Sequence, residues 1–301
     1  MEGLKRLLTA TDFSKASDNA LAHAAFIAKE SGAELHMLHV RIPFPNTSIE
    51  VLSHEFPGPE RFDQALERMS DKNLEALQAP LDVPLVKKLV IEDDVSEAIA
   101  KYVQRHDIEL VVVGTHARGR IGRFFLGSVA ERTARTSPVS VLAVGPGEEH
   151  RAKKTGYNAI LVPLDFSTES VRAFDRAYAL AERRKARVIA LHVIEPVIQP
   201  EFPMFARVPF PQSPHEAESR IRELLKAFID ERGARRVDIV LASGRPYHQI
   251  AEVARDQSAD LIVMGAHGLG LVERLLLGSV TERTLRSAPC PVLVNKGVEV
   301  G

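Results

Sequence analysis

The residues best suited to chemistry in this chain of 301 residues form a spaced motif, Gly265-x-x-Gly268-x₉-Gly278-Ser279. The motif follows an apolar run at 261–264 and precedes a segment that can form a helix. Glycine lets the backbone turn sharply and approach a ligand closely. A strand, a glycine-rich loop and a helix N-terminus together bind phosphate, because free N–H groups and the helix dipole favour an anion. The motif therefore predicts a phosphate-binding loop.

The same motif occurs half the chain earlier, where Gly114, Gly127 and Ser128 match and Ala117 replaces Gly268. This offset indicates a tandem duplication of whole domains, since it is too long for a solenoid repeat. We expect domains at 1–146 and 157–301, joined by a polar linker. An L-residue at positive φ costs roughly 1–2 kcal/mol. If Gly268 has positive φ, the second copy should therefore bind its ligand more tightly.

Asp12 and Asp165 end the first apolar strand of their copies. In a doubly wound sheet, the ligand crevice lies outside the carboxyl ends of the strands, where the strand order reverses. The aspartate is therefore expected across from the glycine loop, in reach of a base or ribose. The alternative is an aspartate that only stabilises the start of a helix.

The serines have a competing interpretation as helix caps. Ser128-Val-Ala-Glu131 and Ser279-Val-Thr-Glu282 both fit the capping-box pattern, which serves a helix with or without a ligand. The two roles are compatible.

Support for catalysis is sparse. The chain has neither a Gly-x-Ser-x-Gly elbow nor a Walker lysine. His116 and His267 lie within the loops and are the only candidates for a reactive group near phosphate. His39 and His192, in apolar strand ends, are interpreted as core histidines satisfied by hydrogen bonds. No cluster has metal-ligand spacing, so any Mg²⁺ would come with a nucleotide.

Composition excludes several classes of partner. A formal charge of −1 argues against nucleic acid, which leaves a strongly basic footprint. Cys290 is the one cysteine, which suits a reducing compartment. The N-terminus lacks the apolar core of a signal peptide, and no apolar run approaches 18 residues. We expect a cytoplasmic protein with no membrane or nucleic-acid partner.

Strands and helices are predicted to alternate, which favours a parallel sheet with helices on both faces. Ser14 and Gly32 should begin and end the first helix, and a helix at 61–77 should direct Phe62, Leu66, Met69 and Leu77 inward. Strands are expected near 7–11, 35–40, 83–91, 110–113, 140–144, 159–163, 187–193, 236–242, 260–264 and 290–295.

With the aspartates, the His-Val pairs at 39–40 and 192–193 and the glycine motifs in register, the chain resembles a tandem universal stress protein. The resemblance covers both halves almost end to end. It implies in each half an α/β fold with a five-stranded parallel sheet of order 3-2-1-4-5, flanked by helices, and ATP between the first and fourth strands. It also implies that strands 140–144 and 290–295 pair the halves within the chain, and it allows a homodimer.

Carried over by position, the resemblance implies an adenine-nucleotide site in the second copy. That site comprises Pro163, Asp165, Val193, Met264, Gly265, Gly268, Gly278, Ser279 and Val280. The matching positions in the first copy are Asp12, Val40, Gly114, Gly127, Ser128 and Val129. Ala10 and Ala117 depart from the pattern there, so nucleotide binding by the first copy stays open.

The sequence thus predicts a cytoplasmic, ATP-binding protein of stress response or regulation. It should lack strong catalytic activity, and any ATP hydrolysis should be slow, because neither a general base nor a phosphate-bound lysine is evident. Two alternatives stay open. One is an ATP-using transferase or ligase of the same nucleotide-binding superfamily, and the other is an assembly module that binds no nucleotide.

Overall fold

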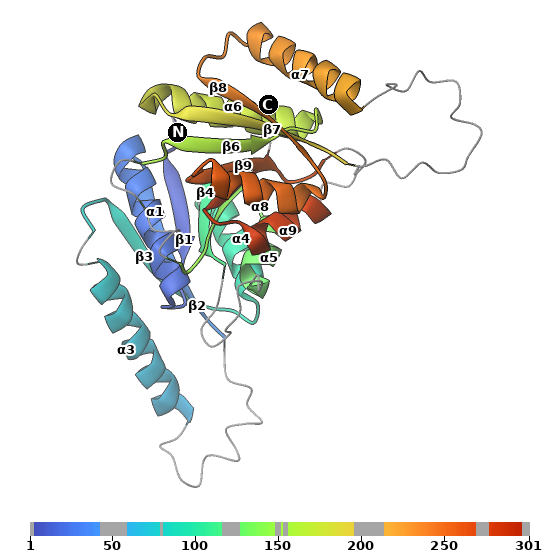
Figure 1. Cartoon of the computed structure of the whole chain (residues 1–301). Helices are drawn as coiled ribbons and strands as arrows, with labels where there is room; N and C mark the ends of the chain where they lie inside the picture. The colour runs from blue at the N-terminus through green and yellow to red at the C-terminus, as the bar shows by residue number, and fades with distance from the viewer. Residues whose placement is uncertain are drawn as a thin grey trace, which may run out of the picture. The chain divides into compact units, whose positions relative to one another are not determined.

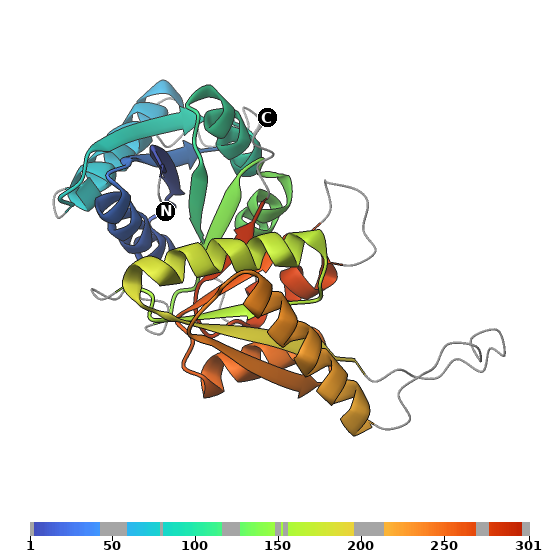
Figure 2. The same cartoon turned by 90° about the horizontal axis from the view of Figure 1, so that it is seen from above.

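The computed structural model describes residues 3–42, 59–78, 81–115, 127–147, 152, 156–195, 214–268 and 277–296. The chain divides into two compact units, 1–156 with 296–301, and 157–295. In each unit, strands and helices alternate and helices lie along both faces of the sheet (Figures 1 and 2). The predicted α/β fold class is confirmed.

The first unit contains a parallel sheet of strand order β3-β2-β1-β4-β5. This is the predicted order 3-2-1-4-5. Its elements are β1 (Arg6–Ala10), α1 (Lys15–Ser31), β2 (Glu34–Arg41), α3 (Pro59–Gln78), β3 (Leu85–Ile91), α4 (Val95–Arg105), β4 (Leu110–Gly114), α5 (Ser128–Thr136) and β5 (Ser140–Val144).

The second unit repeats this order as β8-β7-β6-β9-β10, again with parallel pairing. The elements are β6 (Ala159–Pro163), α6 (Thr168–Arg184), β7 (Arg187–Ile194), α7 (Pro214–Glu231), β8 (Val237–Ser243), α8 (Pro246–Asp256), β9 (Leu261–Gly265), α9 (Ser279–Ser287) and β10 (Val292–Asn295). The first and fourth strands, β6 and β9, are neighbours, so the segments that follow them leave the sheet side by side.

Apolar central strands form the core of each unit. A parallel sheet covered on both faces needs near-continuous apolar runs, and the sequence supplies them. Fully buried strand residues include Leu7, Leu8, Leu35, Leu110, Leu142, Ile160 and Leu161. Alanine-rich α1 packs across β1 and β4, and α6 packs across β6 and β9. This rigid base fixes the carboxyl ends of the strands.

The predicted boundaries of α1 are confirmed in detail. The Ser14 side chain accepts a hydrogen bond from the Ser17 amide, and Gly32 ends the helix in the left-handed region with φ 70°. Glycine is favoured at that position because it lacks the Cβ that disfavours positive φ.

One position in a predicted helix face was wrong. Met69 in α3 is 61% exposed, whereas Ser70 and Leu74 are buried. Leu66, Ser70 and Leu74 are spaced by four residues and share one side of the helix. Met69 lies about 100° away from Ser70 around that helix, because each residue turns it by that angle. The side chain of Phe62 lies outside the described residues.

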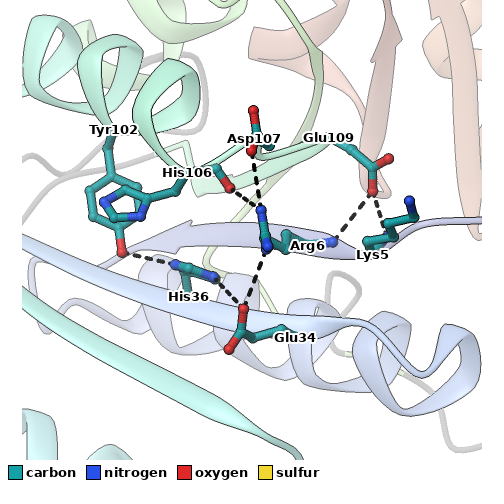
Figure 3. A network of polar contacts seen from close by, with 8 residues as sticks. All are labelled: Lys5, Arg6, Glu34, His36, Tyr102, His106, Asp107 and Glu109. Carbon is teal, nitrogen blue, oxygen red and sulfur yellow. Dashed lines mark hydrogen bonds and ion pairs between the residues drawn. The ribbon is translucent and has the colours of Figure 1, made fainter.

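A polar cluster lies in the first unit, at the amino-terminal ends of β1 and β2 (Figure 3). Buried His36 contacts the Tyr102 hydroxyl through Nδ1 at 2.8 Å and Glu34 through Nε2 at 3.1 Å. Arg6 lies 3.5 Å from Glu34 and donates to the His106 carbonyl at 3.2 Å. These groups lie at the edge of the sheet opposite the carboxyl ends of the strands.

Candidate functional site

A cavity of about 280 Å³ opens at the carboxyl ends of β6, β7 and β9 in the second unit. Strand order reverses between β6 and β9, so the cavity lies at the switch point where such folds bind ligands. Its lining includes all nine positions that the sequence predicts for the second copy: Pro163, Asp165, Val193, Met264, Gly265, Gly268, Gly278, Ser279 and Val280. The structure thus brings these residues together, while their role in binding stays a prediction.

Asp165 contributes to the start of α6. Its Oδ1 accepts hydrogen bonds from the Ser167 amide at 3.0 Å and the Ser167 hydroxyl at 2.5 Å. Ser167 in turn caps the helix by accepting from the Ser170 amide. The helix-start interpretation is therefore correct for Oδ1. The other carboxylate oxygen, Oδ2, lies beside Gly268 at the cavity. One side chain can serve both roles.

The condition of positive φ at Gly268 is not met, because that glycine is not among those with φ in the left-handed region. Its glycine identity has a steric reason instead. A Cβ at this position would overlap Oδ2 of Asp165. Glycine at 268 thus leaves room for the aspartate that follows the neighbouring strand.

The first glycine of each motif is a packing residue. A Cβ on Gly265 would lie 2.7 Å from Cβ of Glu169 in α6. A Cβ on Gly114 would lie 2.7 Å from the backbone of Ala16 in α1. The sequence interpretation, that Gly265 lets the backbone approach a ligand, was incomplete: Gly265 lines the cavity, but the helix beside it already excludes a side chain.

The capping-box interpretation of the serines was wrong. Gly278 is the N-cap of α9 and Gly127 is the N-cap of α5, and neither helix has a side-chain cap. A capping side chain must belong to the N-cap residue, and glycine supplies none. Ser279 and Ser128 are the first helical residues and are exposed. The first N–H groups of α9 therefore border the cavity without a side-chain cap.

His192 has a satisfied ring nitrogen, as predicted, but it also lines the cavity. Its Nδ1 lies 2.7 Å from the Leu164 carbonyl. A carbonyl only accepts hydrogen bonds, so Nδ1 carries the proton. The ring packs against Phe166, whose φ is 63°. Backbone in this sparsely populated region persists only where its surroundings enforce it.

Sequence reasoning did not place several other lining residues in the site. They are Leu164, Ser170, Leu191, His192, Glu195, Pro246, Ile250 and Thr281, whereas His267 lines the cavity as its place in the loop predicts. Thr281 had a usable signal, since it follows Ser279 by two residues and its hydroxyl donates to the Gly265 carbonyl at 3.0 Å. Ile250 and Ser170 had none, because both come from helices whose packing only the fold reveals.

The structure describes only part of the matching site in the first copy. Asp12 accepts a hydrogen bond from the Ser14 amide at 3.0 Å, as Asp165 does from Ser167. Val40 and Gly114 lie at the carboxyl ends of β2 and β4. Gly127, Ser128 and Val129 begin α5. His116 and Ala117 lie outside the described residues.

The described ranges offer neither a metal-binding cluster nor a membrane-spanning helix. No group of three or more His, Cys, Asp or Glu side chains there is placed to hold a metal ion. Among the helices within those ranges, none is long and apolar enough to cross a membrane.

Comparisons with known proteins find similarity along both halves of the chain. A model of the universal stress protein family matches the chain twice, over residues 3–145 and 156–296. A putative universal stress protein of Staphylococcus epidermidis is 36% identical over 148 residues, 48% of this chain and 87% of that protein. A universal stress protein of Mycobacterium tuberculosis is 33% identical over 197 residues, 64% of this chain and 63% of that protein.

The fold has close counterparts among solved structures. The universal stress protein from Archaeoglobus fulgidus aligns over 98% of this chain and 99% of its own, with a TM-score of 0.66 at 22% identity. At that identity the likeness concerns the fold alone.

Proposed function

Because the chain belongs to the universal stress protein family, we propose that it serves the stress response by binding ATP in the cavity of its second unit. One observation supports this most strongly: a carboxylate, a strand end and an uncapped helix N-terminus converge on a single cavity. These three features suit the base, the ribose and the phosphates of a nucleotide. We also propose that the protein is cytoplasmic.

The phosphates would lie at the start of α9. Backbone N–H groups at a helix N-terminus point outward, and the helix dipole adds roughly half a positive charge there. A Cβ on Gly278 would lie 3.3 Å from the Ala266 carbonyl oxygen and 3.4 Å from Cα of His267. Glycine therefore keeps the approach to these N–H groups free of a side chain. The exposed Ser279 hydroxyl can donate to a phosphate oxygen, since no capping bond engages it.

The adenine base would lie between the ends of β6 and β7. Asp165 Oδ2 can accept a charge-assisted hydrogen bond from a base or ribose group. Val193 lines the cavity at the end of β7, beside the Asp165 turn, and offers a peptide donor and acceptor. Apolar walls come from Leu191, Ile250 and Met264. Aliphatic walls with a few polar groups are typical of ligand pockets.

We propose binding without strong catalysis. Within the described lining, the cavity has neither a lysine nor an arginine to stabilise a transferring phosphoryl group. Any Mg²⁺ would be held mainly by the phosphates, since no described cluster of side chains could hold it alone. The transferase or ligase alternative requires a reactive group, and His267 is the described candidate. The assembly-module alternative requires that neither unit binds nucleotide.

The deciding experiment combines mass spectrometry with calorimetry. Nucleotide released from freshly purified protein is identified by mass, and ATP is then titrated into the stripped protein. We expect an adenine nucleotide, saturable binding and little release of phosphate. Asp12→Ala is the matched control for Asp165→Ala, because the two residues have equivalent turns. No binding at millimolar ATP would favour the assembly module, and rapid phosphate release would favour the enzyme.

A further inference from the structure

The hydrogen-bond ladder between β6 and β7 stops beside the cavity. In a parallel sheet, successive residues of a strand bond alternately to its two neighbours. Arg187 donates to Asn158 at 3.0 Å, and Leu191 accepts from Leu164 at 2.7 Å, so alternate residues from 187 to 191 face β6. Ile194 accepts from Gly244 at 3.0 Å and faces β8. The backbone of Val193 therefore faces the β6 side.

His192 occupies the next position in this ladder. Continued regularly, the ladder would join the Val193 amide to the Leu164 carbonyl. That carbonyl instead accepts from Nδ1 of His192 at 2.7 Å. Among the described residues, no hydrogen bond joins the Val193 backbone to the segment that follows β6. An imidazole thus takes the acceptor that the peptide would have used.

The first unit repeats the arrangement. The ladder between β1 and β2 ends with a bond from the Thr11 amide to the Leu38 carbonyl at 2.9 Å. The Thr11 carbonyl then lies 2.8 Å from Nδ1 of His39, one residue before Val40. Two independent copies therefore end the same ladder with a histidine side chain.

We infer that His192 is a positioning residue, which ends the ladder and keeps the N–H and C=O of Val193 available to the base of the ligand. The identity of that ligand rests on the proposed function. The end of the ladder at His192 does not depend on which ligand binds. Adenine presents a ring acceptor, N1, next to a donor amino group, so an available N–H and C=O from one residue fit its edge.

The first test needs no ligand. Amide hydrogen exchange in the full chain should be fast at Val193 and slow at Leu191 in the wild type. In His192→Leu the Leu164 carbonyl becomes available, so the Val193 amide should gain roughly tenfold protection, which corresponds to one ordinary hydrogen bond. Val40, in the other unit, should not change. A Val193 amide as protected as Leu191 in the wild type, or unchanged in the variant, would overturn the inference.

The second test uses ATP and a rescue. His192→Leu should weaken ATP binding by roughly 3–10-fold, as for one lost hydrogen bond. His192→Asn should restore it, because the Asn side-chain N–H can replace Nδ1 as donor to Leu164. Asn has no counterpart of Nε2, so rescue separates positioning from a direct ring contact with the ligand. If His192→Asn shows wild-type exchange at the Val193 amide but still binds ATP weakly, the positioning role is overturned.

A matched control separates this inference from the proposed function. His248→Leu changes a histidine of the same unit that is 61% exposed and lies outside the lining, so it should leave ATP affinity unchanged. If the wild type binds no ATP, the proposed function fails while the exchange result still decides the ladder argument. If the wild type binds ATP and His192→Leu binds equally well, only the positioning role fails.

Discussion

The carboxylate of Asp165 occupies the space that a side chain on residue 268 would need. Asp165 follows the first strand of its sheet and Gly268 follows the fourth, so the two loops at the switch point fit against each other. Glycine at 268 is therefore a condition for the position of the aspartate. The glycine loop and the aspartate act as one unit of the site.

Replacing Gly268 with alanine should weaken ATP binding in the second unit. The added Cβ would displace Oδ2 of Asp165 and remove the contact that we propose between this oxygen and the ligand. A hydrogen bond to a charged group contributes roughly 1.5–3 kcal/mol, so calorimetry should show a loss of about tenfold or more. The converse variant, Ala117→Gly, should strengthen any binding by the first copy. Equal affinity in Gly268→Ala and the wild type would contradict the steric argument.

Two substitutions of Asp165 should separate its structural role from its ligand role. Asn at this position keeps an oxygen that can accept from Ser167, whereas Ala removes it. Asp165→Ala should lose roughly 1 kcal/mol of stability as well as affinity. Asp165→Asn should lose affinity with a smaller change in stability. Thermal unfolding and ATP titration of both variants measure the two effects. Full affinity in both would leave only the helix-start role.

Substitutions at the start of α9 should affect binding more than stability. Gly278→Lys fills the approach to the helix N-terminus and should abolish ATP binding in the second unit. Ser279→Ala removes an exposed hydroxyl that caps nothing, so stability should change by less than about 0.5 kcal/mol. A loss of about 1 kcal/mol or more in Ser279→Ala would restore the cap interpretation. Full ATP affinity in Gly278→Lys would mean that the phosphates bind elsewhere.

The first unit should lose stability in mild acid because of His36. Burial is the main cause that lowers the pKa of His36 below 6.5, and the neighbouring Glu34 opposes it. The positive charges of His106 and of the Arg6 guanidinium also lower the pKa of His36. A histidine with a lowered folded pKa binds protons more readily when unfolded. The contribution of neutral His36 to the stability of the first unit is therefore complete above about pH 6.5. It is lost as the pH falls through the folded pKa.

His36→Ile is the matched variant for this pH dependence. Ile189 holds the equivalent place in the second unit, since it pairs with Leu161 as His36 pairs with Leu8. The variant leaves the Tyr102 hydroxyl without its partner, but that cost does not vary with pH, because burial raises the pKa of Tyr102 to about 12. Denaturation of the full chain, followed by signals from the first unit, should show a flatter pH profile in His36→Ile. Parallel pH profiles of stability in the wild type and His36→Ile would show that His36 is not the cause of the pH dependence.

The closing strands of the two units are predicted to pair. β5 and β10 are each the last strand in the order of their own unit, and short apolar edges such as Val141–Leu142 and Val292–Val294 are hazardous when open. In a Cys290→Ser background, cysteine pairs scanned across 140–144 and 292–295 should form a disulfide in at least one register. Control cysteine pairs between residues 140–144 and β8 should form no disulfide. Failure of every closing-strand pair would contradict this arrangement.

The sequence was sufficient to predict the elements that depend on local pattern. The apolar runs at 140–144 and 159–163 became β5 and β6 with the same bounds, because buried parallel strands need such runs. The glycines and the aspartate of the second copy were found because their pattern repeats, and the other lining positions, such as Val193, were implied by the resemblance to the family. Ser279 shows the limit. A capping box fits its sequence, but whether residue 278 or 279 leaves the helical region depends on the loop that ends at Gly278.

Contacts between distant segments could not be predicted. Gly268 was given a backbone reason, conditional on positive φ, yet the cause is the side chain of Asp165, which follows β6. Met69 was placed inward by its hydrophobicity, whereas Ser70 and Leu74 are the buried residues of that helix. In each case the deciding atom belongs to another element, which periodicity along the chain cannot reveal.

The packing of α6 against Gly265, and of α1 against Gly114, has a consequence for how such motifs diagnose activity. A domain that no longer bound a nucleotide would still require its first glycine, since the helix beside it leaves no room for a side chain. That glycine is therefore a marker of the fold. Position 268 contacts the aspartate of the site, so it is the more informative position for sorting duplicated domains into ligand-binding and vestigial copies.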